Sequence, residues 1–334
     1  MAKIKKILVT GGAGYVGSHC IISLINFGYC PIVVDNFSNS KKTVFKKLKQ
    51  ITKKNIKYYH LDLRDKKKLN QVFKKHKFHS VFHFAGLKSV SESNKDPLLY
   101  FNNNIAGSVS LFECMKENKV FKIIFSSSAC VYNSNETLPW HEKTKTGDTN
   151  NSYGFSKYSI ERILMDLSKS DKRWKIGIAR YFNPIGNHCS GIIGEETDNK
   201  STNLIPSILR VIKKDWKFID VHGNNYQTKD GTGVRDYIHV MDLVAAHVKI
   251  LKYLKKGKTF EIFNLGSGKG YSVKDILKAF SENNIKIPYK VKPRRIGDLG
   301  VYYTSNAKAR NLLKWSPKHN LKSMIQDICK FVCK

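Results

Sequence analysis

Short apolar runs alternate with longer stretches of helical length over the first 180 residues, and this rhythm constrains the fold more than any other feature. Five runs have the length and the apolar content of buried parallel strands; they are residues 7–9, 32–34, 81–84, 123–125 and 176–179. The intervening stretches are long enough to hold helices, so the pattern predicts repeated βαβ units. The chain is therefore predicted to be an α/β protein with a doubly wound parallel sheet.

The regular alternation fades after Arg180. Residues 183–233 are rich in Asn, Gly, Thr and Pro around one helix-like stretch, 204–214, which is typical of loops that shape a binding site on a smaller lobe. Two later stretches, 236–253 and 259–265, again resemble material of the first lobe. We therefore expect a nucleotide-binding domain over residues 1–182 and a mainly substrate-binding lobe over 183–334, with segments 236–265 returning to the first domain.

A glycine-rich turn follows the first predicted strand directly, and a helical pattern follows the turn. Its glycines are Gly11, Gly12, Gly14 and Gly17, and the motif can begin at either of the first two. Glycine permits a tight turn and a close approach of backbone N–H groups to a pyrophosphate at the helix N-terminus. The strand–turn–helix context predicts a Rossmann-type dinucleotide site.

Asp35 lies at the end of the second predicted strand, 18 residues after Gly17. A carboxylate at this position binds ribose hydroxyls and repels a 2′-phosphate. NAD is therefore favoured over NADP, and Lys41 and Lys42 are the nearby cations that argue for NADP. A second glycine cluster, residues 266–270, lacks the P-loop spacing and is predicted to be a turn after a strand.

Tyr153 and Lys157 are spaced i, i+4 at the start of a helical pattern, which places them on one helix face. A neighbouring ammonium favours the phenolate, so Tyr153 is a candidate base for a hydroxyl proton. Ser128 ends the serine run that follows the predicted strand 123–125, at the edge where α/β sheets place ligands. We therefore expect the Ser128 hydroxyl to bond the reacting oxygen.

The chain carries 59 Lys and Arg against 26 Asp and Glu, a formal net charge of +33. Only nine of these cations are arginines, and the 50 lysines are scattered over the chain. Specific nucleic-acid surfaces favour Arg, so specific nucleic-acid binding is not expected. The alternative to an enzyme is a protein with a dehydrogenase-like fold that binds nucleic acid or senses the redox state. Proteins that have adopted such a role usually lack the Tyr–Lys pair, which is present in this chain.

The seven cysteines form no C-x-x-C pair, so free thiols are expected and neither a disulfide framework nor a metal site is predicted. No apolar run approaches the length of a membrane span, and the first predicted strand begins too early for a signal peptide. We therefore expect a soluble, cytoplasmic protein that does not associate with membranes.

Longer segments add a more specific signal than the fold motifs. The chain resembles the extended short-chain dehydrogenase/reductase family, and within it most closely the UDP-glucose 4-epimerases, through residues 84–90, 126–132, 180–186, 231–240 and 293–299. The resemblance implies an isomerase of galactose and nucleotide-sugar metabolism. It would interconvert UDP-glucose and UDP-galactose at C4 through a transient 4-keto sugar, with tightly bound NAD. A homodimer formed by the helices containing 97–116 and 153–167 is also implied.

The resemblance also implies two sets of site residues, one for the cofactor and one for the substrate. The cofactor-binding set is Gly11, Gly14, Tyr15, Val16, Gly17, Asp35, Asn36, Ser38, Asn39, Ser40, Asp62, Leu63, Phe84, Ala85, Gly86, Lys88, Asn103, Ser126, Tyr153, Lys157 and Tyr181. The substrate-binding set is Lys88, Ser128, Tyr153, Phe182, Asn183, Asn203, Leu204, His222, Arg235, Arg295, Asp298 and Tyr302. Arginines suit a diphosphate, and a carboxylate suits ribose hydroxyls.

The sequence departs from the family pattern at Thr202, His222, Asn133 and Ile296, which affects details of the uracil and phosphate site. Sugar 4,6-dehydratases carry an acidic pair where this chain has Ala129 and Cys130, and uronate epimerases match the motifs less well.

Tyr302 occupies a place where family members that accept N-acetylated sugars resemble one another in having a smaller residue. It is therefore expected to exclude an N-acetyl group; the alternatives are that Tyr302 is only packed between the lobes, or that Tyr303 takes this position.

Overall fold

A seven-stranded parallel sheet forms the centre of the larger lobe. Its order is β10-β6-β5-β4-β1-β2-β3, and every neighbouring pair is parallel. The strands are β1 (Lys6–Thr10), β2 (Cys30–Asp35), β3 (Lys57–His60), β4 (Phe78–His83), β5 (Lys122–Ser128), β6 (Lys175–Tyr181) and β10 (Phe260–Leu265). The order reverses between β1 and β4, which is where doubly wound sheets bind ligands. The predicted α/β fold class is confirmed.

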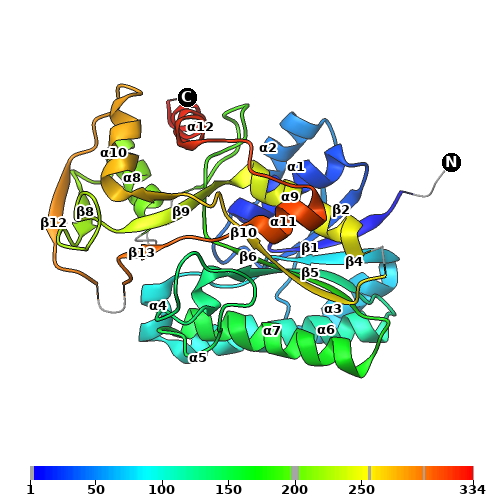
Figure 1. Cartoon of the computed structure of the whole chain (residues 1–334). Helices are drawn as coiled ribbons and strands as arrows, with labels where there is room; N and C mark the ends of the chain where they lie inside the picture. The colour runs from blue at the N-terminus through cyan, green and yellow to red at the C-terminus, as the bar shows by residue number, and fades with distance from the viewer. Residues whose placement is uncertain (1–3, 197–202, 255–256, 296–297, 334) are drawn as a thin grey trace.

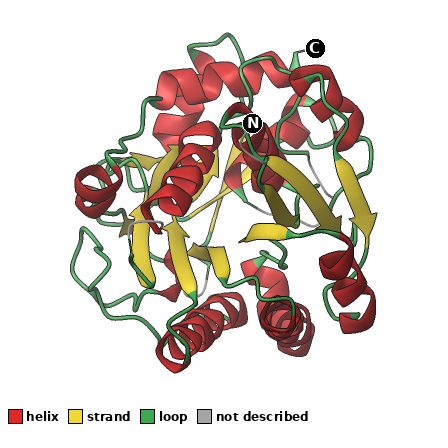
Figure 2. Cartoon of the chain, turned by 90° about the vertical axis from the view of Figure 1, so that its right-hand side faces the viewer, coloured by secondary structure: helices red, strands yellow, loops and turns green. Residues whose placement is uncertain are grey.

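Helices cover both faces of this sheet (Figures 1 and 2). One face carries α1 (Tyr15–Asn26), α2 (Val44–Thr52), α9 (Val240–Tyr253) and α11 (Ala307–Leu313), and the other carries α3 (Lys66–Lys75), α6 (Gly107–Glu117) and α7 (Ser152–Ser170). Each layer buries its own apolar cluster against the sheet. The short elements α4 (Val90–Lys95), α5 (Pro97–Tyr100) and the π-helical η1 (Phe101–Ala106) pack beside α7, and the 3₁₀ turn η2 (Ala129–Val131) follows β5.

The smaller lobe has its own sheets and its own core. Strands β7 (Asn183–Ile185), β11 (Gly270–Ser272) and β13 (Val301–Tyr302) pair around β9 (Val234–His239), while β8 (Ile219–His222) pairs with β12 (Tyr289–Lys292). Helices α8 (Leu204–Ile212), α10 (Val273–Ser281) and α12 (Leu321–Val332) bury a third apolar cluster with these strands. The computed structural model describes residues 4–196, 203–254, 257–295 and 298–333.

The structure differs from the sequence-based expectations in three places. Strand β3 was not predicted, because three of its four residues are exposed and it carries no apolar run. Strands β7 and β8 lie in the segment that we predicted to be loops around one helix. Of the segments expected to return to the first lobe, α9 packs on α1 and β10 joins the large sheet, whereas β9 pairs within the smaller lobe.

Among the described residues, no helix combines the length and the apolar character needed to cross a membrane. All seven cysteines are free thiols.

Candidate active site

A pocket of about 1160 Å³ lies between the two lobes, at the carboxyl ends of the large sheet's strands. This volume lies slightly above the range of about 300–1,000 Å³ that is usual for a single small-molecule site. Every site residue predicted from the sequence lines it. Two of the departures from the family pattern, Thr202 and Ile296, lie outside the described residues.

Several lining residues were not predicted from the sequence: Ser89, Cys130, Glu195, Tyr226 and Tyr237. None belongs to a spacing pattern of its own, and only the folded chain brings them to the pocket. Ser89 follows Lys88 directly, and Cys130 lies two residues after Ser128. Their closeness in sequence to these predicted residues was the only signal that could have found them.

The glycine turn connects β1 to α1, and each glycine has a separate reason to lack a side chain. Gly11 has φ +68°, and a Cβ there would lie 2.6 Å from the Ala85 nitrogen. A Cβ on Gly17 would lie 2.2 Å from the Gly11 carbonyl oxygen. Gly12 instead packs against the Val33 side chain and does not line the pocket. The pocket motif therefore consists of Gly11, Gly14 and Gly17.

The N-terminus of α1 is open toward an anion. Gly14 is the N-cap, no side chain caps the helix, and its first turn holds no acidic residue. The first N–H groups of a helix have no partner within the helix, and the helix dipole favours negative charge there. Without a Cβ on Gly14 the backbone remains accessible, so this turn fits a pyrophosphate.

Asp35 ends β2 with both carboxylate oxygens held in place. Oδ2 accepts the Ala13 N–H at 2.9 Å, and Oδ1 accepts the Phe37 N–H at 2.8 Å and the Ser40 hydroxyl at 3.1 Å. This fixed carboxylate can accept from ribose hydroxyls, and it would repel a phosphate at the same place. Of the two nearby lysines, Lys42 lies over the Phe37 ring, 5.5 Å from its centroid.

Asp62 borders the same end of the pocket. It accepts two hydrogen bonds from the Arg64 side chain, at 2.8 Å each, and one from Asn36 at 3.0 Å. The hydrogen bonds from Arg64 hold the pKa of this carboxyl well below its usual range. The pocket therefore carries two fixed acceptors at the end where an adenosine is predicted.

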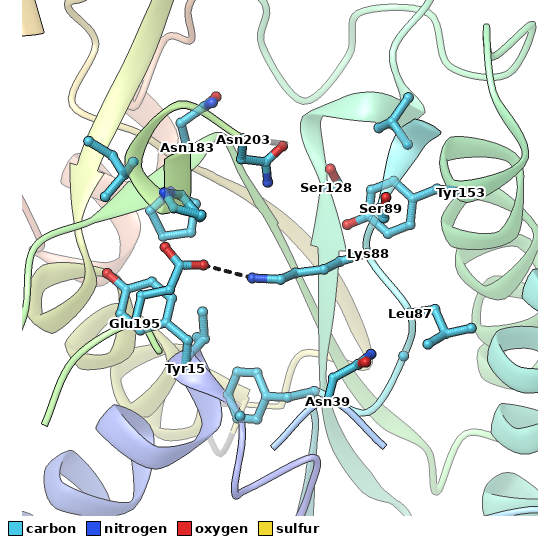
Figure 3. Close-up of a pocket in the computed structure, with 18 of the residues that line it drawn as sticks. Tyr15, Asn39, Leu87, Lys88, Ser89, Ser128, Tyr153, Asn183, Glu195 and Asn203 are labelled. Carbon is cyan, nitrogen blue, oxygen red and sulfur yellow. Dashed lines mark hydrogen bonds and ion pairs between the residues drawn. The ribbon is translucent and has the colours of Figure 1, made fainter. Parts of the chain in front are cut away.

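Tyr153, Lys157 and Ser128 meet at the other end, where α7 begins. Asn151 caps α7 by accepting the Gly154 N–H at 2.7 Å. A Cβ on Gly154 would lie 2.6 Å from the Cys130 carbonyl oxygen, so glycine lets the helix start pack against the turn after β5. This contact brings Tyr153 beside Ser128 (Figure 3). The Lys157 ammonium donates to the Ser126 carbonyl at 2.9 Å and lies 6.0 Å from the Tyr153 ring centroid.

Burial dominates the electrostatics of this centre. It raises the pKa of Tyr153 well above its usual value, and the hydrogen bond with Ser128 opposes that shift. Burial also lowers the pKa of Lys157 to about 8, against the opposing charge of Glu161. The sequence indicated an ammonium that favours the phenolate of Tyr153, and burial of the phenol acts in the opposite direction.

A buried ion pair supports the strands beneath the reactive residues. The Arg180 guanidinium donates to both oxygens of Glu161, which also accepts from the Ser127 hydroxyl. The Ser126 hydroxyl is hydrogen-bonded to the Tyr181 phenol. This network ties β5, β6 and α7 together directly behind Ser128 and Lys157.

The side of the pocket formed by the smaller lobe carries the predicted substrate residues. Arg235 pairs with Asp298 at 3.1 Å, and its guanidinium lies 4.6 Å from the Tyr302 ring centroid. The Tyr302 hydroxyl donates to Asn183 at 3.0 Å, and its ring stacks on Trp140 with centroids 5.7 Å apart. Tyr302 lines the pocket and Tyr303 does not, although Tyr302 is also packed between the lobes.

The residue at the predicted uracil position is polar. The His222 ring lies 3.3 Å, Nδ1 to oxygen, from the Pro293 carbonyl. An imidazole there offers less apolar area to a base than the phenylalanine that is common at this position.

The second glycine cluster forms a turn after β10, as predicted. The N–H groups of Ser267 and Gly268 donate to the buried Asp236 carboxylate at 2.7 and 3.0 Å. The groups that would hold a phosphate in a P-loop bind an internal carboxylate in this chain.

Within the described residues, His239, His319 and Asp327 bring their ligating atoms together apart from the pocket. The Met241 N–H donates to His239 Nδ1 at 3.0 Å, so Nε2 of the neutral ring carries the proton and donates to Asp327 at 3.1 Å. The two imidazoles stack with centroids 4.0 Å apart, so their in-plane lone pairs do not converge. The arrangement favours a hydrogen-bonded group over a cation site.

Comparison with known proteins decides the family. The model of the NAD dependent epimerase/dehydratase family matches residues 7–266. The chain belongs to this family. The predicted resemblance is thereby confirmed, and the family's cofactor is the predicted NAD.

Individual relatives match over nearly the whole chain. UDP-glucose 4-epimerase from Neisseria gonorrhoeae is 44% identical over 327 residues, which cover 98% of this chain and 97% of that protein. The enzyme of the same name from Dictyostelium discoideum is 44% identical, with 98% and 95% covered. The crystal structure of UDP-glucose 4-epimerase from Bifidobacterium longum in complex with NAD⁺ and UDP superposes with a TM-score of 0.95 at 42% identity, with 98% of each chain covered.

Proposed function

We propose that this chain catalyses the reversible C4 epimerisation of UDP-glucose and UDP-galactose, through a transient 4-keto sugar and with tightly bound NAD. The observation that carries the proposal is that Tyr153, Ser128 and Lys157 share one pocket with an open helix N-terminus and with Arg235. The names of the relatives, at 44% identity over nearly the full length, support the same reaction.

The residues that would hold NAD fit it. The open turn at Gly14 suits the pyrophosphate, and the fixed carboxylates of Asp35 and Asp62 suit the adenosine. Together with the rest of the predicted cofactor set, they line the pocket. When bound, the nicotinamide ring supplies a reversible hydride acceptor.

The chain's own residues handle the proton. The C4 hydrogen of a hexose is not acidic, so inversion requires oxidation of the C4 alcohol to a ketone. Tyr153 is placed to take the hydroxyl proton on its phenolic oxygen as the C–H electron pair leaves C4, and to return the proton when the ketone is reduced. Ser128 donates to the reacting oxygen, and the Lys157 ammonium favours the phenolate.

Inversion also requires the keto sugar to present its other face. This needs firm anchoring of the nucleotide and weak contacts to the hexose. Arg235 and Arg295 provide cations for the diphosphate, and Asp298 provides an acceptor for ribose hydroxyls. Asn183, Asn203 and Leu204 complete the proposed nucleotide side, and all of these residues line the pocket.

Two rival reactions are weaker. A sugar 4,6-dehydratase needs an acid and a base after the serine strand, and Ala129 and Cys130 supply neither. Uronate epimerases share the oxidation step but match fewer of the sequence motifs. Reuse of the fold for nucleic-acid binding or redox sensing leaves the retained Tyr153 and Lys157 unexplained.

The same proposal includes a cytoplasmic homodimer formed through α5, η1, α6 and α7. Its support is a group of exposed apolar side chains on these helices: Leu98 is 77% exposed, Leu99 39%, Val109 37% and Phe155 47%. Apolar surface of this kind often marks a protein interface.

We also propose a domain boundary between Phe182 and Asn183. Strand β6 ends at Tyr181 in the large sheet, and β7 starts at Asn183 beside β9 in the smaller lobe.

A deuterium label at C4 tests the proposed route. UDP-galactose deuterated at C4 should give UDP-glucose that keeps the label at C4, because the hydride leaves and returns within the pocket. The same conversion of unlabelled substrate in D₂O should place no deuterium at C4. Deuterium from the solvent at C4 would show a proton abstraction and would overturn the proposal.

A further inference from the structure

An ion pair crosses the pocket between its two walls. The Lys88 ammonium lies 2.9 Å from Oε1 of Glu195. Lys88 lies in the segment after β4, and Glu195 lies in the segment after β7. In Figure 3 the dashed line between them passes above Tyr15 and Asn39, and below Asn183 and Asn203. The pair therefore joins the segment after β4 to the segment after β7, and both of its residues line the pocket.

The two partners are held to different degrees. The Glu195 side chain is 12% exposed, whereas the Lys88 side chain is 54% exposed. The Glu195 N–H donates to Oδ1 of the buried Asn187 at 3.1 Å. A Cβ on Gly194 would lie 2.5 Å from the same oxygen, so this approach depends on glycine. Glu195 is therefore the more buried and more firmly held partner, and Lys88 is the more exposed one.

The ion pair lies between the two ends of the proposed cofactor site. Asp35 marks one end and Tyr153 the other, and Tyr15 starts the helix between them. The charge of Glu195 acts on Tyr15 strongly enough to raise its pKa further than burial alone. A dinucleotide held at both ends would lie beside the ion pair, because Lys88 and Glu195 line the same pocket as Asp35 and Tyr153.

A lone carboxylate at this place would repel a pyrophosphate. An ammonium has three donors, so Lys88 can hold Glu195 and bind a phosphate oxygen as well. The pair can therefore stay closed while an anion is bound. The proposed reaction returns NAD to its starting state in every turnover, so the cofactor does not have to leave the pocket during catalysis.

We propose that Glu195 is a cofactor-retaining residue that acts through Lys88, and that their ion pair must open before NAD leaves the pocket. The inference rests on the proposed function, because it takes NAD as the resident dinucleotide. Glu195 takes no part in the hydride or proton transfer. Its effect is on the dissociation rate of the cofactor.

The adjacent residue offers a matched control. Glu196 pairs with Lys47 at 2.6 Å, and its side chain is 41% exposed. Glu195→Gln and Glu196→Gln remove the same charge one residue apart. Glu196 also lines the pocket, but its partner Lys47 lies on α2 and does not, so only the first variant removes an ion pair between two residues that line the pocket. Holoenzyme carrying isotopically labelled NAD is diluted into excess unlabelled NAD, and the label that stays bound is followed over time.

Glu195→Gln should release NAD about fivefold faster than the wild type, which corresponds to about 1 kcal/mol for a partly exposed ion pair. Glu196→Gln should release it at the wild-type rate. In a Lys88→Gln background, Glu195→Gln should cause no further increase in the NAD release rate. If Glu195→Gln acted only by loosening the lobe, it would still raise the release rate in that background.

Three results would overturn the inference. Release from Glu195→Gln at the wild-type rate would show that the pair retains nothing. Equal acceleration by both glutamate variants would point to general charge or stability. If the wild-type protein holds no NAD, the proposed function fails, and the proposed role of Glu195 fails with it. This result is distinguishable from the other two, because the NAD content of the wild type is measured before any variant is compared.

Discussion

Replacing Tyr302 with cysteine should admit N-acetylated sugars to the pocket. The phenol ring lines the pocket, with its hydroxyl on Asn183 and its face stacked on Trp140. An N-acetyl group at C2 needs space beside the sugar, and cysteine removes the ring that fills it. We expect the wild type to act on UDP-glucose and UDP-galactose and to show little activity on UDP-N-acetylglucosamine. Tyr302→Cys should raise kcat/KM for the latter by a factor on the order of 100.

The same substitution has a cost in stability that follows from its contacts. Removal of the phenol eliminates its stack on Trp140, its contact with the Arg235 guanidinium and its hydrogen bond to Asn183. Together these contribute about 2–4 kcal/mol. The free energy of unfolding, from denaturant titration, should fall by that amount while UDP-glucose is still converted.

Chromatographic separation of the UDP-sugars measures both activities in one assay. Tyr303→Cys is the matched control, because Tyr303 does not line the pocket and its carbonyl only accepts the Trp140 N–H at 3.1 Å. This variant should keep the wild-type specificity. Comparable wild-type rates on both classes of sugar, or an equal gain in the two variants, would refute the steric argument.

Three further substitutions test other parts of the site. Tyr153→Phe keeps the ring and removes the proton acceptor, so kcat should fall about 10²–10⁴-fold with an unchanged circular dichroism spectrum; a near-normal rate would refute the assignment. Lys157→Met removes a cation that favours the phenolate, so the acidic limb of the pH–rate profile should move to higher pH, and an unmoved limb would contradict this role. Glu161→Leu leaves the buried Arg180 charge unpaired, so the free energy of unfolding should fall by about 3–5 kcal/mol; a fall below about 1 kcal/mol would show that the pair is not required.

The sequence predicted the large sheet because its central strands are buried on both faces and therefore carry continuous apolar runs. It did not reveal β3, whose Lys-Tyr-Tyr-His sequence forms an exposed edge. The smaller lobe was harder to predict, because its short strands pair with segments that are distant in the chain, such as Val234–Ser272 and Val301–Val234.

In the candidate site too, residues in local sequence motifs were predicted, and residues placed by contacts distant in the chain were not. Gly14, Asp35 and Tyr153 belong to local motifs, so their spacing was sufficient to find them. Glu195 reaches the pocket through a hydrogen bond to Asn187 and a partner 107 residues away, and no spacing encodes that contact. The effect of burial on the pKa of Tyr153 could not be foreseen either, because burial is a property of the folded pocket and not of the Tyr–Lys spacing.

Incubation of the purified protein with UDP-galactose, without added cofactor, tests the central proposal most directly. The proposed function predicts that UDP-glucose forms until the two sugars reach equilibrium, with NAD already bound to the protein and no net build-up of NADH. Protein that forms no UDP-glucose, or that forms it only with stoichiometric added NADP, would contradict the proposal.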